Sequence, residues 1–154
     1  MNYSSNRFGA LRRRLLAVVA VLAAVSGFAT AGEPGPQPVA MIFDTDLGND
    51  VDDAMALAVI NALADRGQCE LLAVTVTKDN PYAGPCVDLL NTFYGRPEIA
   101  IGTVRDGMAP QDGKYIRQLA TAGGDGRPRY AHDLAHGADA PEAVGLLRKT
   151  LAGR

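Results

Sequence analysis

The sequence predicts an α/β fold, in which a parallel sheet is flanked by helices. Three short apolar runs, at 39–43, 71–77 and 99–102, are typical of strands that are buried on both faces. The segments between them, at 54–64 and 87–94, have the composition and length of helices. Strands that alternate with helices through short links form parallel sheets with right-handed crossovers, and the helices cover both faces.

The first 31 residues have the layout of a cleavable secretory signal. Arg7 and three arginines at 12–14 precede an apolar run at 15–25, and small residues follow at 29–31. A membrane-spanning helix needs about 20 apolar residues, whereas this run has 11. We therefore expect export, to the periplasm or out of the cell, with no membrane attachment after cleavage; the alternative is an uncleaved membrane anchor.

A proline-rich linker at 32–38 separates this signal from the predicted domain at 39–154. Removal of residues 1–31 takes away four arginines and no acids, which leaves 11 basic and 17 acidic side chains. The resulting net charge of −6 indicates that nucleic acid is not a partner.

Local signals set the expected bounds of the elements. The run at 39–43 is continuous and ends in acids, and the helix that follows meets no glycine or proline before Gly67. The second strand is followed by the Asn80-Pro81 turn signal, and the second helix stops at Gly95.

The two cysteines, Cys69 and Cys86, lie before and well beyond the second strand. A strand rises about 3.3 Å per residue, so the two thiols are too far apart for a disulfide, which needs a Cα separation below about 7 Å. We expect both to be unpaired and buried.

The last third of the chain has weaker patterning. Residues 104–137 are polar and rich in glycine, with a short helix indicated only at 115–120, and this loop could form a lid over a site. A final amphipathic helix is expected at 144–151, with Asp139 as its N-cap. Because a parallel sheet of three strands should continue after that helix, we expect a truncated product or a fragment of a longer fold.

Five aspartates crowd the ten residues that follow the first strand: Asp44, Asp46, Asp50, Asp52 and Asp53. Ligands of open α/β sheets bind beyond the carboxyl ends of the strands, and the repulsion among five acids favours a bound divalent cation. Oxygen ligands favour Ca²⁺ or Mg²⁺. Stabilisation of a helix N-terminus explains three of these acids at most. An EF-hand is excluded, because its glycine and glutamate positions hold Asn49 and Met55.

Residues 44–56, DTDLGNDVDDAMA, resemble the N-terminal signature of the inosine/uridine-preferring nucleoside hydrolases, D-x-D-P-G-x-D-D-A. Leu47 replaces the proline and two residues are added before Asp52, as in a secreted bacterial branch of that family. The block at 73–80, together with 89–96, is similar to the second strand of the family, its asparagine and its helix exit. The resemblance covers about residues 39–151 and implies a nucleoside hydrolase-like, Rossmann-like fold.

This resemblance implies Ca²⁺-dependent hydrolysis of the N-glycosidic bond of ribonucleosides to base and ribose, through a Ca²⁺-bound water. It implies that Asp46 is both a Ca²⁺ ligand and the general base, and that Asp53 is a second Ca²⁺ ligand. Asp52 and Asn80 would bind the ribose. Asp44 would support the site by orienting the loop.

The resemblance leaves several points open. It gives no role to Asp50, and it places His132 and Asp133 in a loop region near the substrate without making them site residues. The later half of the family supplies further Ca²⁺ ligands and a histidine that this chain lacks, so the isolated chain could be inactive. Base preference and homo-oligomer formation are not predicted.

Two other functions remain as alternatives. Haloacid dehalogenase-like, Mg²⁺-dependent phosphatases also begin with a strand and D-x-D, and Asp44 and Asp46 would then be nucleophile and acid. Gly48 stands where that pattern has threonine or valine, and the pattern leaves Asp52 and Asp53 unexplained. The non-enzymatic alternative is a truncated remnant or a sugar-binding fragment.

Overall fold

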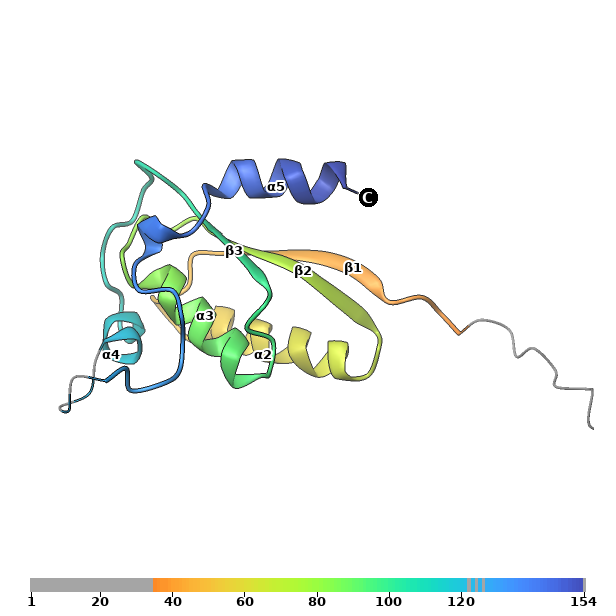
Figure 1. Cartoon of the computed structure of the whole chain (residues 1–154), viewed down its shortest axis with the longest axis horizontal. Coiled ribbons are helices and arrows are strands. Elements are labelled where there is room, and N and C mark those ends of the chain that lie inside the picture. Colours follow the sequence, from red (N-terminus) through yellow and green to blue (C-terminus); the bar gives the residue numbers. More distant parts are fainter. Residues whose placement is uncertain (1–34, 122, 124, 126, 154) are drawn as a thin grey trace, which may run out of the picture. The chain divides into compact units, whose positions relative to one another are not determined.

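The fold is a parallel three-stranded sheet with helices against both faces (Figure 1). The computed structural model describes residues 35–121, 123, 125 and 127–153, so the predicted signal at 1–31 lies outside the described residues. The elements are β1 (Val39–Thr45), α2 (Asp52–Asp65), β2 (Cys69–Val76), α3 (Ala83–Phe93), β3 (Ala100–Thr103), α4 (Ile116–Ala120), the 3₁₀ helix η1 (Gly137–Asp139) and α5 (Ala143–Ala152). The predicted α/β class and parallel sheet are confirmed.

The three strands end at the same edge of the sheet. The strand order is β1-β2-β3, and Thr45, Val76 and Thr103 are aligned across it. Backbone hydrogen bonds continue this alignment by one residue, from Thr77 N to Thr45 O at 2.9 Å and from Val104 N to Val76 O at 3.0 Å. The loops that leave the three strands therefore start side by side.

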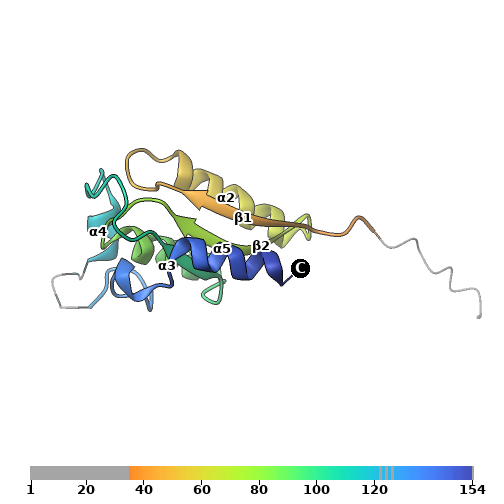
Figure 2. The same ribbon diagram turned by 90° about the horizontal axis from the view of Figure 1, so that it is seen from above.

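The hydrophobic core lies between the sheet and helices α2 and α3. Leu57 of α2, Val74 and Val76 of β2 and Val87 of α3 are all fully buried in one cluster. The other face of the sheet is covered by α5, which contacts β2 and β3 (Figure 2). Its buried residues, Ala143 and Leu146, lie four and seven residues after Asp139, the N-cap predicted from the sequence.

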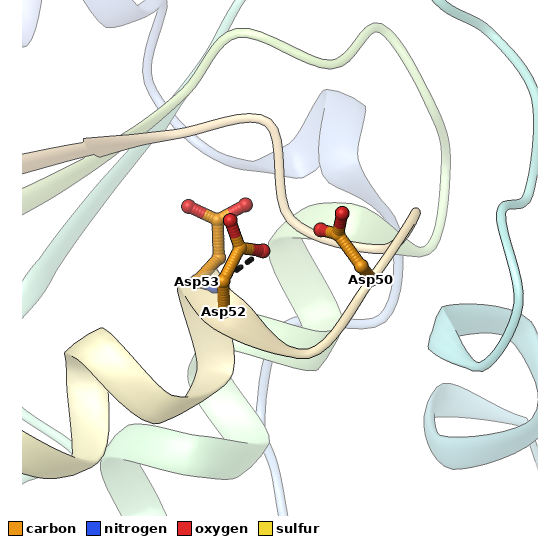
Figure 3. A group of neighbouring side chains, drawn as sticks. All are labelled: Asp50, Asp52 and Asp53. Atoms are coloured by element: carbon orange, nitrogen blue, oxygen red, sulfur yellow. Dashed lines mark hydrogen bonds between the residues drawn. The ribbon is translucent and has the colours of Figure 1, made fainter.

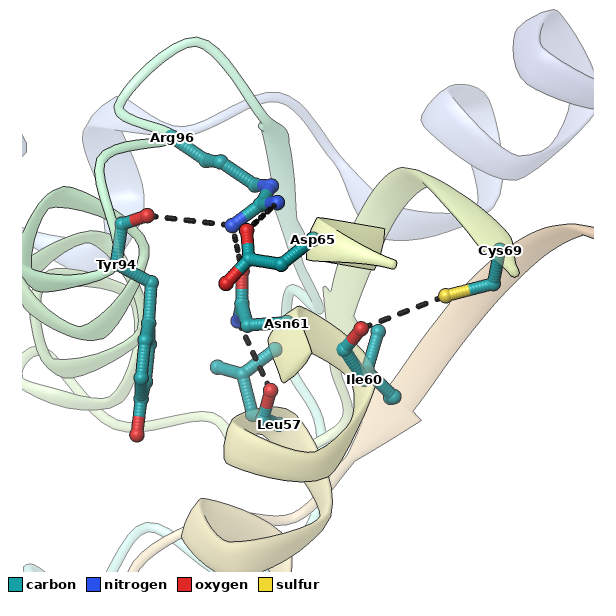
Figure 4. Close-up of polar contacts among 7 residues, drawn as sticks. All are labelled: Leu57, Ile60, Asn61, Asp65, Cys69, Tyr94 and Arg96. Carbon is teal, nitrogen blue, oxygen red and sulfur yellow. Dashed lines mark hydrogen bonds and ion pairs between the residues drawn. The ribbon is translucent and has the colours of Figure 1, made fainter. Parts of the chain in front are cut away.

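Both cysteines are buried and unpaired, as predicted. Cys69 begins β2, and its thiol lies 3.4 Å from the carbonyl oxygen of Ile60 (Figure 4). Cys86 lies in α3, where burial raises the pKa of its thiol to about 12. A thiol with so high a pKa is protonated near neutral pH, so Cys86 acts as a small apolar side chain.

Arg96 joins the ends of α2 and α3 at the opposite edge of the sheet. Its guanidinium donates to Asn61 Oδ1 at 3.0 Å and to Tyr94 O at 3.2 Å, and it pairs with Asp65 at 2.6 Å (Figure 4). The buried amide of Asn61 donates in turn to Leu57 O at 2.9 Å. The contacts of Arg96 are thus structural and lie away from the aspartates.

The start of α3 and the N-cap of α5 differ by more than two residues from those predicted. The structure begins α3 at Ala83, four residues earlier than expected, and Pro85 fits because the first turn of a helix needs no N–H donor. The N-cap of α5 is Glu142, not Asp139, which lies in η1. Glu142 accepts hydrogen bonds from Val144 N at 3.0 Å and from Gly145 N at 2.8 Å.

The cap at Glu142 predicts a pH-dependent contribution to stability. These two backbone N–H groups lower the pKa of Glu142 from its ordinary 4.5. A lowered pKa in the folded state means stabilisation that is complete above pH 4.5 and is lost as pH falls through the lowered value. We expect Glu142→Gln to lower the melting temperature by a few degrees at pH 7. This difference should shrink as pH falls below 4.5.

Thermal unfolding followed by circular dichroism from pH 3 to 8 measures this difference. Glu98→Gln removes the same charge outside any helix and is the matched control. A difference between wild type and Glu142→Gln that stays constant with pH would contradict the capping role.

Candidate functional site

An open hollow of about 340 Å³ lies at the edge of the sheet where the strands end. This acidic hollow is lined by Asp44, Thr45, Asp46, Asp53 and Thr77. Asp46 and Asp53, the two predicted cation ligands, thus share one hollow although they come from the β1 exit and from α2. Asp44, the predicted supporting residue, lines the same hollow.

The end of β1 positions the acids on one side of the hollow. Asp44 accepts a hydrogen bond from the hydroxyl of Thr75 on the neighbouring strand. Thr45 is only 3% exposed, and its hydroxyl oxygen accepts from Leu47 N at 3.0 Å. Since Leu47 is fully buried, it anchors the acid loop, residues 46–51, to the core between two acidic positions.

Asp53 reaches the hollow from the first turn of α2. Its pKa is raised from the ordinary 3.8, first by partial burial and then by the negative charges of Asp46 and Asp52, while the Thr45 hydroxyl opposes the shift. The raised pKa means that the ionised form of Asp53 is disfavoured in the metal-free fold. A cation in the hollow would relieve this repulsion, which is the electrostatic condition for a metal site.

Asp50, Asp52 and Asp53 form a second acidic group, in which one carboxylate oxygen of each lies within 4.8 Å of the others (Figure 3). Asp52 and Asp53 begin α2, and Asp50 precedes them on the acid loop. A hydrogen bond between the side chains raises the pKa of Asp50 and lowers that of Asp52. Asp53 belongs to this group and to the acidic hollow, so it connects the two.

The donors of both groups suit a hard divalent cation. They are carboxylate and hydroxyl oxygens, which Ca²⁺ and Mg²⁺ prefer over nitrogen or sulfur. Five carboxylates and two threonine hydroxyls lie at this edge of the sheet. The Ca²⁺ cofactor stays a prediction, because this donor set does not separate the two metals.

Asn80, the predicted ribose ligand, lies outside the acidic hollow. It is 4% exposed, and its Nδ2 donates to Pro110 O at 2.8 Å and to Asp112 Oδ1 at 3.0 Å. Its Oδ1 accepts from Tyr82 N at 2.8 Å. Both N–H groups of the amide are therefore engaged, and a ribose hydroxyl would have to displace one of these partners.

His132 and Asp133 lie beside a different part of the fold. The Nδ1 of His132 lies 2.8 Å from Tyr130 O, and the backbone N–H of Asp133 donates to the buried Asp88 at 2.7 Å. Asp133 lines an open hollow of about 300 Å³ with Ile99 and other residues, none of which lines the acidic hollow.

Residues 107–117, within the loop predicted as a lid, are attached to the loops that leave β1 and β2. Lys114 N donates to Gly48 O at 2.7 Å, and Asn80 holds Pro110 as described. Burial raises the pKa of Tyr115 to about 12, with further contributions from Cys86 and Asp53. This segment therefore packs next to the acid loop through backbone contacts, which no side-chain pattern in the sequence indicates.

A contact between Lys78 and Asn49 at this edge was not predicted from the sequence. Lys78, directly after β2 and Thr77, is 1% exposed and donates from Nζ to Asn49 Oδ1 at 3.0 Å. A lone lysine after a strand has no sequence signal for burial, because lysine is almost always exposed.

Comparison with known proteins identifies no relative: no protein-family model, curated protein or solved structure matches this chain. Within the described part of the chain, no helix has the length and apolar character needed to cross a bilayer.

Proposed function

We propose that this chain binds a divalent cation, Ca²⁺, in the acidic hollow and acts there on the N-glycosidic bond of ribonucleosides. One observation supports the cation site above all others: Asp46 and Asp53, paired by the sequence signature, line one hollow and Asp46 raises the pKa of Asp53. The nucleoside substrate and the nucleoside hydrolase-like fold rest on the sequence resemblance. The parallel α/β sheet, with the acids at its carboxyl edge, is consistent with both.

The positions of the residues are consistent with the roles that the resemblance implies. Asp46 is exposed at the hollow, so its carboxylate can accept a proton from an attacking water. Asp52 is exposed at the start of α2 and can accept hydrogen bonds from ribose hydroxyls. Asp44 is held by Thr75 and keeps the end of β1 in place. Ca²⁺, when bound, would act as a Lewis acid and position the substrate.

The proposal also covers location and partners. A signal layout at residues 1–31 supports export to the periplasm or beyond, where the partner would be a free ribonucleoside. No part of the acidic hollow is basic, which fits a neutral nucleoside better than a nucleotide. The sequence leaves open whether the chain forms a homo-oligomer, and gel filtration with light scattering determines it.

Calorimetric Ca²⁺ titration of the full chain, together with ribose release from inosine and uridine, tests this function. We expect Ca²⁺ binding with one cation per chain, and ribose release that stops in EDTA. Glu98→Gln, at the opposite end of the strands, should behave as wild type.

The assay separates the alternatives. Hydrolysis of p-nitrophenyl phosphate with Mg²⁺, and no ribose release, would favour the phosphatase. Ca²⁺ binding without either activity would leave a cation-binding or sugar-binding fragment. A chain that binds no Ca²⁺ would contradict the proposal.

A further inference from the structure

A buried ammonium group lies directly beneath the acid loop. The side chain of Lys78 is the largest of those that are fully buried, and its exposed fraction is 1%. Among the described residues it forms no ion pair, and its one hydrogen bond goes to the neutral Oδ1 of Asn49. Burial of an ammonium without a charged partner is costly, so a stabilising interaction with its surroundings must offset that cost.

The hydrogen bond from Lys78 fixes the orientation of the Asn49 amide. An ammonium has three donors and no acceptor, so only the Oδ1 of Asn49 can face it. The Nδ2 of Asn49 must then point the other way, and it donates to Asp46 Oδ2 at 3.5 Å. A chain of hydrogen bonds thus runs from Lys78 through Asn49 to Asp46.

We propose that Lys78 is a positioning residue for the cation site and acts on Asp46 through Asn49. The inference rests on the proposed function, since Asp46 is a cation ligand there. Asn49 itself is exposed on the acid loop, so it has no packing contact in the core to hold it. Lys78 holds the amide of Asn49 in one orientation, and that amide in turn orients the carboxylate of Asp46 through its hydrogen bond.

A positioning role and a purely electrostatic effect of Lys78 predict opposite changes in Ca²⁺ affinity. The positive charge of Lys78 repels a cation, so its removal alone would tighten Ca²⁺ binding. Loss of a hydrogen bond that orients a ligand weakens metal binding, typically by 10–100-fold. The sign of the change therefore separates the two effects.

Lys78→Met tests the inference, because methionine keeps much of the length and fills the buried site without a charge. We expect calorimetry to show roughly 10–100-fold weaker Ca²⁺ binding, with a metal-free melting temperature equal to or above that of wild type. Lys114→Met removes an equal charge near Asp50 but leaves Asn49 untouched, so its Ca²⁺ affinity should be unchanged or higher.

Asn49→Ala provides an independent variant, because an exposed loop residue can be replaced without loss of core packing. It should weaken Ca²⁺ binding as Lys78→Met does, and the double variant should lose no more than either single one. If Lys78 only stabilised the fold, the losses of Ca²⁺ affinity in the two single variants would add up in the double variant. Lys78→Met would also lower the metal-free melting temperature.

The results of these titrations distinguish failure of the proposed function from failure of the positioning role of Lys78. Wild type that binds Ca²⁺, with equal or tighter binding in both Lys78→Met and Asn49→Ala, overturns the positioning role alone. Wild type that binds no Ca²⁺ overturns the proposed function and the positioning role together. Wild type that binds Ca²⁺ without ribose release overturns the proposed reaction, and the affinities of the variants still decide the role of Lys78.

Discussion

Asp53→Asn is expected to weaken Ca²⁺ binding by about 100-fold or more and, at the same time, to stabilise the metal-free protein. Asp53 is the residue that joins the acidic hollow to the second acidic group. Replacement of a supporting residue around a metal costs 10–100-fold in affinity, so loss of a direct ligand should cost at least as much. The amide keeps the shape of the side chain and removes only its charge.

The stabilisation follows from the raised pKa of Asp53. Because partial burial and Asp46 disfavour its ionised form, the folded state binds this proton more tightly than the unfolded state does. The metal-free wild type is therefore destabilised above the raised pKa, and this penalty disappears as pH falls below the ordinary value of 3.8. Water reaches most of the side chain and screens its charge, so the gain in melting temperature should be only a few degrees.

Differential scanning calorimetry with EDTA and with Ca²⁺ measures both effects. A ligand at 100 times its Kd stabilises by about 2.7 kcal/mol, which raises the melting temperature of a domain of this size by roughly 10 °C. Wild type should show this shift and Asp53→Asn should not. Glu98→Gln, which removes an exposed carboxylate charge at the opposite edge of the sheet, is the control. Equal Ca²⁺-induced shifts in wild type and Asp53→Asn would remove Asp53 from the cation site.

The sheet and the place of the acids could be predicted because both depend on local sequence. Each strand is a short apolar run, and the strand bounds agree to within two residues with those expected from 39–43, 71–77 and 99–102. The acids follow the first run directly, so the parallel topology alone places them at the carboxyl edge. The prediction of Asp139 as the N-cap of α5 was wrong because aspartate is a preferred N-cap residue and glutamate is not, so the capping pattern does not indicate Glu142.

The contacts around the acid loop could not be predicted, because they join residues far apart in the sequence. Asn80 is engaged by Pro110 and Asp112, about thirty positions later, within a loop that has no periodic pattern. Lys78 is buried because the acid loop supplies Asn49 as a partner, 29 positions earlier. Such contacts depend on how three loops pack together at one edge, and side-chain composition does not encode that packing.

Gly113→Ala should destabilise the protein and weaken Ca²⁺ binding together, although Gly113 lies 62 residues after the end of the acid loop. Gly113 has a φ of +67°, and a Cβ there would overlap the carbonyl oxygen of Gly48. Gly48 itself is closely packed, because a Cβ built on it would lie only 2.9 Å from the side chain of Ile116. The left-handed backbone costs about 1–2 kcal/mol for alanine, and overpacking adds about 1–3 kcal/mol. The expected loss is therefore about 2–5 kcal/mol in the free energy of unfolding.

Gly67→Ala separates the two parts of this loss. Gly67 has the same φ of +67°, but a Cβ there would meet nothing within 4 Å. Denaturant unfolding should show about 1–2 kcal/mol of destabilisation for Gly67→Ala, with unchanged Ca²⁺ affinity. The excess loss in Gly113→Ala then measures the contact with Gly48, and weaker Ca²⁺ binding in that variant alone would show that residues 107–117 hold the acid loop in its binding conformation. If both variants lose the same stability and keep the same affinity, the loop holds its conformation without this contact, and Leu47 and Thr45 must suffice to position the aspartates.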